Sequence, residues 1–371
     1  MSLALTSTGG TALGHDGPIS LSEGTFGGEG RRVDATGYLL LPGIVDAHGD
    51  GFERHMAPRR GAVRDLAIAR THVEAELASS GITTAHLAQF YSWEGGMRGP
   101  AFAWALAEAL GHFPAQLTLA MQLRVETHLL AAYADIEALI TEHAIGHIVF
   151  KDHLPHDALA KGKRPPRLTG QALKSGRSPE AHEALLQNLH ANGPEVPAAL
   201  DALCTKLTAC GIRIGSHDDH TPHDRHIWHA RGAALAEFSE TLEAAQTTRA
   251  QGGYIIMGAP NLIRGSSHKG NIAAQTLIEA GLCDALASDY QYPAPAAFKL
   301  AADGTLPLPE AWALISERPA HLLGYIDRGT LNEGQRADLL VVNATTKLIE
   351  ATFAAGRLVH LTGAFAERLV A

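Results

Sequence analysis

Histidine and aspartate recur in this sequence directly after short apolar runs. His48 and Asp50 follow one such run, His217 follows a second, and Asp289 ends a third. Each run is typical of a buried β-strand. Strand ends that present imidazoles and carboxylates are how a parallel barrel assembles a metal site from distant parts of its chain. The pattern therefore predicts a metal-dependent hydrolase.

His48 and Asp50 are two positions apart. On an extended strand both side chains would face the same side and could bind one divalent ion together. Asp46 falls on the same face. The alternative is a turn capped by the Asp50 carboxylate, which needs no metal.

His217 begins a run of polar residues in the string Ser216-His217-Asp218-Asp219-His220. A lone imidazole is more often a hydrogen-bonded core residue than a ligand. Carboxylates beside a ligand histidine can orient its ring. Asp218 or Asp219 could instead be the N-cap of a helix, and the two interpretations are compatible.

Asp289 is the candidate for the catalytic base. A divalent ion lowers the pKa of its bound water to about 7. A carboxylate at the end of the last strand could contact the metal and also accept the proton of that water. The alternative is an Asx turn.

A pair of metal ions would also need a bridging anion. Glu126 ends the third expected strand, and Lys151, which could be carbamylated, ends the fourth. Because Glu126 needs no modification, we favour it as the bridge. His153 could add a ligand or contact the substrate.

Several residues after the first and seventh expected strands could bind phosphate. A loop rich in glycine and serine offers backbone N–H groups to phosphoryl oxygens, and arginine and histidine add charge. The alternative for each arginine is a solvated surface charge. The candidates are Arg54, Arg59, Asn261, Arg264, Ser267 and His268.

Length and composition limit the class of protein. The chain has 371 residues, 46% of them hydrophobic and 19% charged, which suits one large globular barrel with an appendage. A net charge of −9 argues against nucleic-acid or anionic-membrane partners. Three cysteines without paired spacing, and the lack of an apparent signal peptide or membrane span, predict a cytoplasmic protein.

Strand-like and helix-like segments alternate through the middle of the chain, which predicts a (β/α)8 TIM barrel over residues 41–327. Residues 1–40 and 328–371 are expected to form one small β-sandwich domain, with a hairpin turning at Gly356. The stretch Leu154–His190 is longer than a usual loop and is expected to be a functional insertion or a lid. The expected strands are Ile44–His48, Ile82–Gln89, Leu117–Glu126, His147–Asp152, Gly211–His217, Ala233–Phe238, Tyr254–Gly258 and Ala285–Asp289, with helices such as Leu66–Ser80, Ala101–Leu110, Ala131–His143 and Ala198–Cys210 between them.

The string from Leu41 to Asp50, Leu-Pro-Gly-Ile-Val-Asp-Ala-His-Gly-Asp, resembles the opening of amidohydrolase-superfamily barrels, with His-x-Asp in place of the commoner His-x-His. Further strings are similar to those of the superfamily's diphosphatases that act on a ribose 5-triphosphate carrying a 1-phosphonate. They are Ser80–Thr84, Ser216–Asp219, Ala236–Phe238, Met257–Asn261, Arg264–Asn271 and Ser288–Tyr290.

The resemblance implies a role for each candidate residue. His48, Asp50 and His217 would bind metal, Glu126 would bridge, and Asp289 would be the base. Many relatives place a further histidine on the sixth strand, where this chain has Glu237, so Glu237 becomes another candidate ligand.

The expected reaction is hydrolysis of a phosphoanhydride to release pyrophosphate. One or two divalent ions would take part, with zinc preferred and manganese or magnesium as alternatives. The partner would be a small phosphorylated sugar, and a homo-oligomer is compatible with the sequence. Two other functions stay open: a C–N hydrolase of the same superfamily, such as a deacetylase or cyclic amidase, and a metal-binding barrel without turnover.

Overall fold

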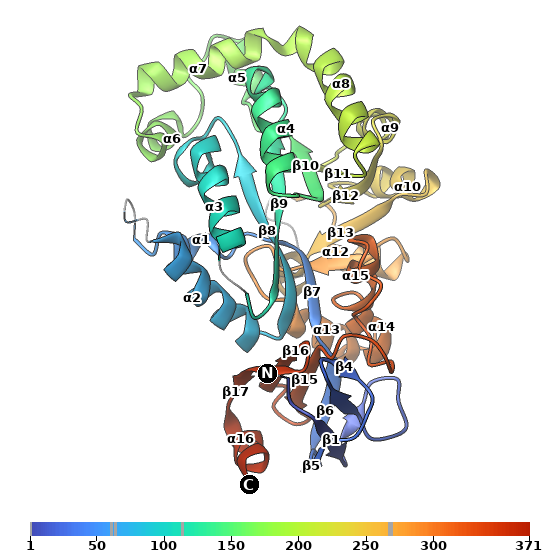
Figure 1. Cartoon of the computed structure of the whole chain (residues 1–371). Coiled ribbons are helices and arrows are strands. Elements are labelled where there is room, and N and C mark those ends of the chain that lie inside the picture. The colour runs from blue at the N-terminus through green and yellow to red at the C-terminus, as the bar shows by residue number, and fades with distance from the viewer. Residues whose placement is uncertain (1, 60–61, 63–64, 113–114, 266–269) are drawn as a thin grey trace. The chain divides into compact units, whose positions relative to one another are not determined.

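The computed structural model describes residues 2–59, 62, 65–112, 115–265 and 270–371. The chain divides into two compact units. Unit 1 comprises Met1–Leu87, Phe113–Ala120 and Ile256–Ala371, and unit 2 comprises Ala88–His112 and Met121–Ile255. Figure 1 shows the elements in chain order.

Eight parallel strands follow one another in a single sheet, in the order in which they occur in the chain. An isolated parallel bridge between Gly49 and Asp289 joins the end of the first strand to the segment after the last. This is the strand order of a (β/α)8 barrel, so the predicted fold class is confirmed. The strands are β7 (Ile44–Gly49), β8 (Ile82–Tyr91), β9 (Thr118–Glu126), β10 (His147–Lys151), β11 (Arg213–His217), β12 (Ala233–Glu237), β13 (Tyr254–Gly258) and β14 (Ala285–Ala287).

These strands form where apolar runs occur because a parallel sheet is covered on both faces. All ten residues of β8 are buried, as are all six of β7. In unit 1, Val45 and Ala47 of β7 pack with Ile256, Ala285 and Ala287, and with helix α15 (Glu317–Leu322). The other helices of this unit are α1 (Glu53–Met56), α2 (Leu66–Ser79), α11 (Ala259–Arg264), α12 (Ala274–Glu279), α13 (Ala294–Ala302), α14 (Leu308–Ala313) and α16 (Gly363–Val370).

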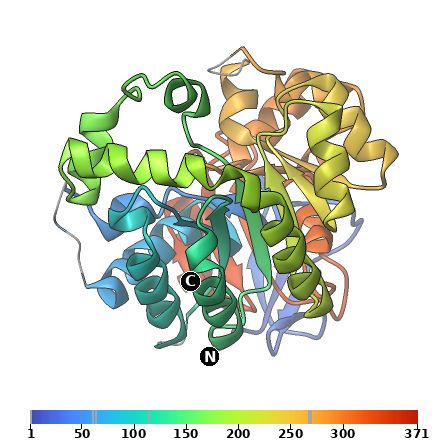
Figure 2. The ribbon, with the colours of Figure 1, turned by 90° about the horizontal axis from the view of Figure 1, so that it is seen from above.

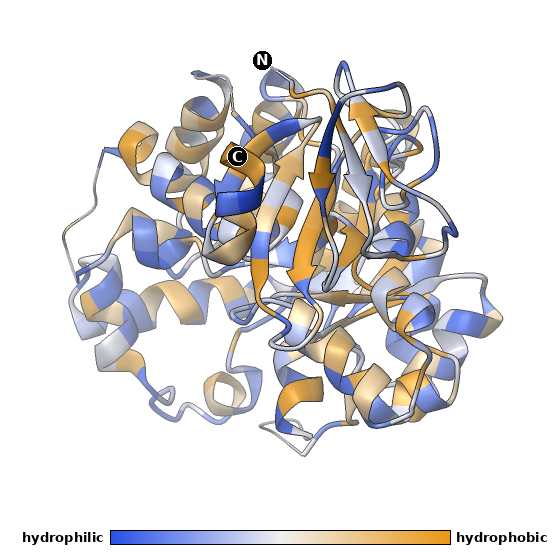
Figure 3. Ribbon diagram, turned by 90° about the horizontal axis from the view of Figure 1, so that it is seen from below, coloured by the Kyte–Doolittle hydropathy of each residue, from blue (hydrophilic) through white to orange (hydrophobic). Residues whose placement is uncertain are grey.

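Two further sheets in unit 1 are built from the ends of the chain, the first from N-terminal strands alone and the second from strands of both ends. The first has the order β4-β3-β1-β5 and the second β17-β16-β15-β6-β2. Their apolar residues, drawn in orange in Figure 3, share one core that includes Leu21, Phe26, Leu40, Val341 and Phe353. The strands are β1 (Leu5–Thr8), β2 (Thr11–Ala12), β3 (Ser20–Ser22), β4 (Thr25–Phe26), β5 (Arg31–Asp34), β6 (Tyr38–Pro42), β15 (Leu339–Asn343), β16 (Ile349–Ala354) and β17 (Arg357–Leu361).

The expected hairpin is confirmed. Strands β16 and β17 are antiparallel, and the two residues between them, Ala355 and Gly356, have φ values of 48° and 69°. Two consecutive left-handed residues are the geometry of a tight hairpin turn. The domain limits at residues 40/41 and 327/328 stay a prediction, because the two compact units divide the chain elsewhere.

In unit 2, helices alternate with the strands. The helices α3, α4 and α8 lie within about two residues of the predicted ranges. Figures 1 and 2 show α7 followed, after a short turn, by α8. The helices are α3 (Pro100–His112), α4 (Tyr133–Glu142), α5 (His156–Ala160), α6 (Leu168–Ser175), α7 (Pro179–Ala191), α8 (Val196–Ala209), α9 (Pro222–Ala230) and α10 (Leu242–Ala250), with 3-10 turns η1 (Gly96–Arg98), η2 (Leu130–Ala132) and η3 (Gly193–Glu195).

The long segment at Leu154–His190 is not an irregular loop: it contains α5, α6 and most of α7. Its leucines form a cluster of their own with Trp93. Arg177 also donates to the Trp93 carbonyl at 2.8 Å. The insertion is therefore a packed helical element of unit 2. Within the part of the chain that the structure describes, no helix is both long and apolar enough to cross a membrane.

Candidate functional site

The first candidate residues lie at the end of β7 in unit 1. The Asp46 carboxylate is 1% exposed and accepts hydrogen bonds from both the backbone N–H and the hydroxyl of Ser288. Burial raises the pKa of Asp46, and the hydrogen bonds from Ser288 oppose that rise. A Cβ at Gly49 would lie 2.7 Å from the Asp46 Oδ2 and 2.8 Å from the Ser288 Oγ. Only glycine fits there.

Backbone hydrogen bonds bring three predicted residues to this strand end. Asp289 N donates to the His48 carbonyl, and Asp50 N donates to the Asp289 carbonyl, each at 2.9 Å. His48 is fully buried. Asp289 lies two residues beyond β14, and Asp50 lies one residue beyond β7. The register between β7 and β8 also shifts between Asp46 and Gly49, so strict alternation does not continue through His48 to Asp50.

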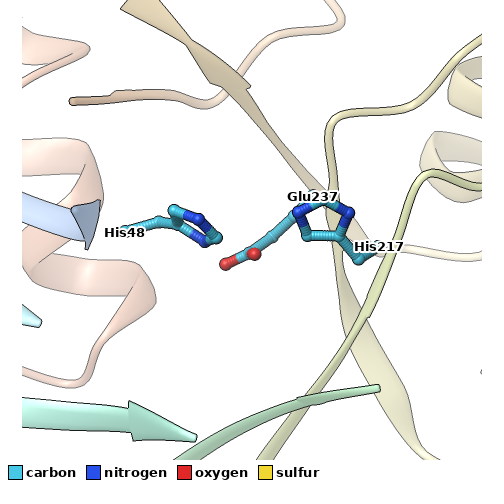
Figure 4. A group of neighbouring side chains, drawn as sticks. All are labelled: His48, His217 and Glu237. Carbon is cyan, nitrogen blue, oxygen red and sulfur yellow. The ribbon is translucent and has the colours of Figure 1, made fainter. Parts of the chain in front are cut away.

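In unit 2, His217 and Glu237 are partners in register on the neighbouring strands β11 and β12. One ligand atom of His217 and one of Glu237 lie within 4.8 Å of each other, and Figure 4 shows both side chains. Glu237 is fully buried and accepts a hydrogen bond from Gln122 Nε2. Asp218 N donates to the Glu237 carbonyl at 3.0 Å. An imidazole and a carboxylate therefore lie together at these strand ends.

The environment of His217 keeps its ring neutral. Burial, together with the positive charges of Lys151 and Arg124, lowers the pKa of His217 to about 3, although Asp218 acts in the opposite direction. Asp218 Oδ1 lies 3.1 Å from His217 Nδ1, and Arg124 Nη2 lies 3.0 Å from His217 Nε2. This geometry suits an Nδ1–H that donates to Asp218 and an Nε2 that accepts, which is the form of histidine that binds metals.

Three basic side chains lie over the ring of Phe90. The guanidinium carbons of Arg98 and Arg124 each lie 4.1 Å from its centre, and Lys151 Nζ lies 4.7 Å from it. Arg124 and Lys151 are buried. Burial and the charge of Arg124 hold the pKa of Lys151 well below its usual range. Cations over an aromatic face are attracted to it, and here they concentrate positive charge next to His217.

Sequence reasoning did not single out Arg124 or Gln122, although a signal was present. Gln122, Arg124 and Glu126 occupy alternate positions of the otherwise apolar strand end Met121–Glu126. Alternate residues of a strand share one face. These three polar side chains contact Glu237, His217 and His153 respectively. Polar residues at every second position of a buried strand are therefore the signal that would have identified Gln122 and Arg124.

Glu126 and Lys151, the two candidates for a bridging anion, have different neighbours. Glu126 Oε1 lies 2.6 Å from His153 Nδ1, and Glu126 Oε2 accepts from His153 N at 3.0 Å and from Trp93 Nε1 at 3.3 Å. Lys151 and His153 both line a cavity of about 180 Å³ with His217. Lys151 is thus the candidate whose side chain acts on His217, and the choice between them stays open.

The helix that follows β11 is capped differently from the expectation. Thr221 is the N-cap of α9 and forms a reciprocal capping box with Asp224. Asp218 and Asp219 are therefore not N-caps, and that interpretation is wrong. Asp219 instead pairs at 2.9 Å with the buried Arg225, which leaves Asp218 beside His217.

Backbone strain recurs after three of the strand ends. Asp218 after β11, Phe238 after β12 and Asp289 after β14 have φ values of 61°, 57° and 52°. Residues other than glycine rarely adopt this left-handed region, and such residues cluster at functional sites. The Phe238 ring also meets the His217 ring edge-on, with centroids 4.9 Å apart.

The predicted phosphate-binding residues after β7 have partners within the chain. Arg54 contacts Glu76 and also donates to the Tyr292 hydroxyl at 2.8 Å. Burial alone would raise the pKa of Glu76, but hydrogen bonds from Arg54 and His55 hold it at about 2. Arg54 is therefore an ion-paired residue in this structure. Arg59 is exposed and forms an isolated bridge with Ala62.

The segment that begins at Gly258 was expected to be a loop, and that expectation is wrong: Ala259–Arg264 is helix α11, with Gly265 as its left-handed C-cap. Asn261 joins this helix to the chain beyond it, since its Oδ1 accepts from Ala274 N at 2.9 Å. Arg264 contacts the hydroxyl of Tyr290. Ser267 and His268 lie outside the described residues.

The donor atoms in this region fit a divalent metal ion. A neutral, buried imidazole at His217 beside a buried carboxylate at Glu237 supplies the nitrogen and oxygen ligands that zinc and manganese use. Within unit 2, two further groups of residues could hold an ion: Glu94, Glu126 and His153, and His128, Asp152 and His156.

No protein-family model matches the chain. The chain is 32% identical over 321 residues to the alpha-D-ribose 1-methylphosphonate 5-triphosphate diphosphatase of Escherichia coli, covering 84% of this chain and 85% of that protein.

Solved structures share the fold. An amidohydrolase from a Sargasso Sea sample matches with a TM-score of 0.63 at 15% identity, over 96% of this chain and 93% of that one. An adenosine deaminase from Xanthomonas campestris with bound zinc matches with a TM-score of 0.54 at 14% identity, over 100% and 96%. The chain is a hydrolase that belongs to the family of the α-D-ribose 1-methylphosphonate 5-triphosphate diphosphatase.

Proposed function

We propose that this protein hydrolyses the triphosphate of a ribose 5-triphosphate that carries a 1-phosphonate, and releases pyrophosphate. The observation that carries the proposal is the group of basic side chains over Phe90, among them Arg124, whose Nη2 lies 3.0 Å from His217 Nε2. A protein with a net charge of −9 cannot attract a polyanion by its overall field. Local cations at the strand ends would supply what that substrate requires.

We also propose which residues hold the metal. His217 and Glu237 of unit 2 would each offer one ligand atom, and His48 of unit 1 is the ligand that the resemblance to the family implies. Asp50 and Asp289 are further candidates from the first and last strand ends, and Lys151 or Glu126 would bridge a second ion. Zinc or manganese suits these nitrogen and oxygen donors. When bound, the metal would lower the pKa of a water and polarise a phosphoryl oxygen.

The remaining steps fall to side chains of this chain. Asp289 would accept the proton of the attacking water as a general base. Arg124 would neutralise charge on the phosphoryl oxygens as the phosphoanhydride breaks and pyrophosphate leaves. Arg264 would add a contact from the end of α11. Attack of water at the α-phosphorus would break its bond to the β-phosphate, so that pyrophosphate leaves and the 5-monophosphate, which still carries its 1-phosphonate, retains the oxygen of the water.

The test is a pyrophosphate-release assay on ribose and nucleoside triphosphates, with zinc, manganese or magnesium and with chelator. We expect metal-dependent release with a ribose triphosphate. Acetylated sugars and cyclic amides are assayed in parallel, with Asp289→Asn as the negative control. Release that persists in chelator would contradict the metal site. Cleavage of an amide without pyrophosphate release would assign the chain to C–N hydrolysis instead.

A further inference from the structure

A second group of imidazoles lies in unit 2, on residues to which no role was assigned above. His128 follows β9, Asp152 follows β10, His156 is the first residue of α5, and His190 lies in the last turn of α7. Two of these imidazoles, His128 and His156, thus lie at the carboxylate of Asp152, and His190 lies beside His156. The histidines at 156 and 190 belong to the helical insertion, which the proposed reaction leaves without a role.

Three of these side chains converge. The Asp152 Oδ2 atom lies 2.8 Å from His156 Nε2 and 3.5 Å from His128 Nδ1. One ligand atom from each residue lies within 4.8 Å of the other two. Two nitrogens bound to one zinc ion at about 2.0–2.1 Å each are roughly 3.3 Å apart in a tetrahedral site. Small adjustments of the side chains would therefore place all three on one ion.

His190 contacts the opposite side of the His156 ring. The two Nδ1 atoms are 2.8 Å apart, and the ring centroids are 5.0 Å apart. One of these nitrogens must carry the hydrogen while the other accepts it. If His156 donates from Nδ1, its Nε2 is left with a lone pair directed towards Asp152. Ligand histidines commonly donate their second N–H to such a partner, which fixes the ring.

The surroundings of His128 agree with a ligand at Nδ1. His128 is buried, and the Thr127 hydroxyl lies 3.1 Å from the same nitrogen. Its other nitrogen, Nε2, faces Gly193, where an added Cβ would be 3.8 Å away. A hydroxyl can rotate its hydrogen away from a cation, so Thr127 would leave Nδ1 available.

We propose that His128, Asp152 and His156 form a second metal site that binds one divalent ion of the zinc class, with His190 as a positioning residue. Two imidazoles and one carboxylate leave a coordination position open for water or an anionic ligand. The ion would tie the segments after β9 and β10 to the insertion helix α5. This site is independent of the proposed diphosphatase reaction.

The test counts metal ions. Wild-type protein and a His156→Gln variant are stripped with chelator, incubated with zinc, desalted and analysed for zinc per chain. We expect His156→Gln to retain about one equivalent less than the wild type. The matched control is His226→Gln on α9, whose ring contacts the Pro222 carbonyl. This control should retain the wild-type number.

Two further variants keep the proposal testable if His156→Gln folds poorly. Asp152→Asn preserves shape and should also lose about one equivalent. His190→Gln should keep the site but weaken its zinc affinity about 10- to 100-fold in a competition with a chromogenic chelator, the usual effect of removing such a partner. Equal zinc content in the wild type, His156→Gln and Asp152→Asn would overturn the proposal, whatever the outcome of the pyrophosphate assay.

Discussion

Ser288 donates two hydrogen bonds to the carboxylate of Asp46, one from its backbone N–H at 2.9 Å and one from its hydroxyl. The two residues are 242 positions apart in the chain, and they join the segment after the eighth strand of the sheet to the first strand. Asp46 was expected to share a face with His48 near the metal. Its observed partner gives it a different task, which is to hold Asp289 at the end of β7.

Because Asp46 and Ser288 lie so close to Gly49, adding one methyl group at position 49 should destabilise the protein. Gly49→Ala would place a Cβ within 2.8 Å of both Asp46 and Ser288, so we expect a loss of about 1–3 kcal/mol in the free energy of unfolding, the usual cost of overpacking. Gly51→Ala is the matched control, since its Cβ would be 3.6 Å from its nearest neighbour, Arg54. Denaturant unfolding of the two variants measures the difference, and equal stabilities would contradict the argument.

The low pKa of His217 predicts how the stability of metal-free protein depends on pH. The folded state holds this ring neutral down to about pH 3, whereas the unfolded state protonates it near its ordinary pKa of 6.5. Between these values the unfolded state binds more protons, so this contribution to stability is full above pH 6.5 and is lost as the pH falls. The slope is at most about 1.4 kcal/mol per pH unit.

A His217→Gln variant provides the comparison for that slope. Urea unfolding in chelator, at several values from about pH 6.5 down to about pH 4, should show a shallower pH dependence for the variant than for the wild type. Parallel pH profiles would mean that His217 is not held neutral in the folded protein.

Asp289→Asn should retain metal and reduce turnover by about 10²–10⁴-fold, the usual contribution of a general base. Asparagine keeps the side-chain shape and can still tolerate the left-handed backbone at this position. Metal content and kcat are measured on the same preparation. Near-normal turnover would remove Asp289 from the mechanism, and joint loss of metal and rate would make it chiefly a ligand.

Arg124→Met should lower kcat/KM for a ribose triphosphate about 10- to 100-fold, because one charge-assisted contact with a phosphoryl group is worth about 1.5–3 kcal/mol. Methionine keeps an apolar side chain against Phe90. Lys206→Met is the control for the loss of a positive charge, since Lys206 pairs with Glu137 on exposed surface. A variant as fast as the wild type would exclude Arg124 from substrate binding.

The strands of the barrel could be predicted from the sequence because they are buried on both faces, so each is a short continuous apolar run between polar segments. For the same reason Glu126 and Lys151 were correctly placed at strand ends. The strands of the terminal sheets could be predicted from the residues of their turns, as at Gly356. These features depend on the order of residues within a short segment, so one sequence is enough to predict them.

The partners of the candidate residues could not be predicted in the same way. That Arg124 lies against His217, or that Asn261 binds the backbone of Ala274, depends on which side chains meet across neighbouring elements. The helix at Ala259–Arg264 was mistaken for a loop because the segment was interpreted from its glycine and serine content. Its proline lies at the start of the helix, where a helix tolerates it.

The left-handed backbone at Asp218, Phe238 and Asp289 also has a consequence for attempts to make this enzyme more heat-resistant. Glycine adopts that conformation without steric cost, so a selection for thermal stability alone should favour glycine at these positions. Such gains would remove the Phe238 ring from His217 and the carboxylate from position 289, at the expense of the chemistry proposed for them. Positions where glycine improves melting temperature but abolishes turnover would therefore map the active centre without any substrate analogue.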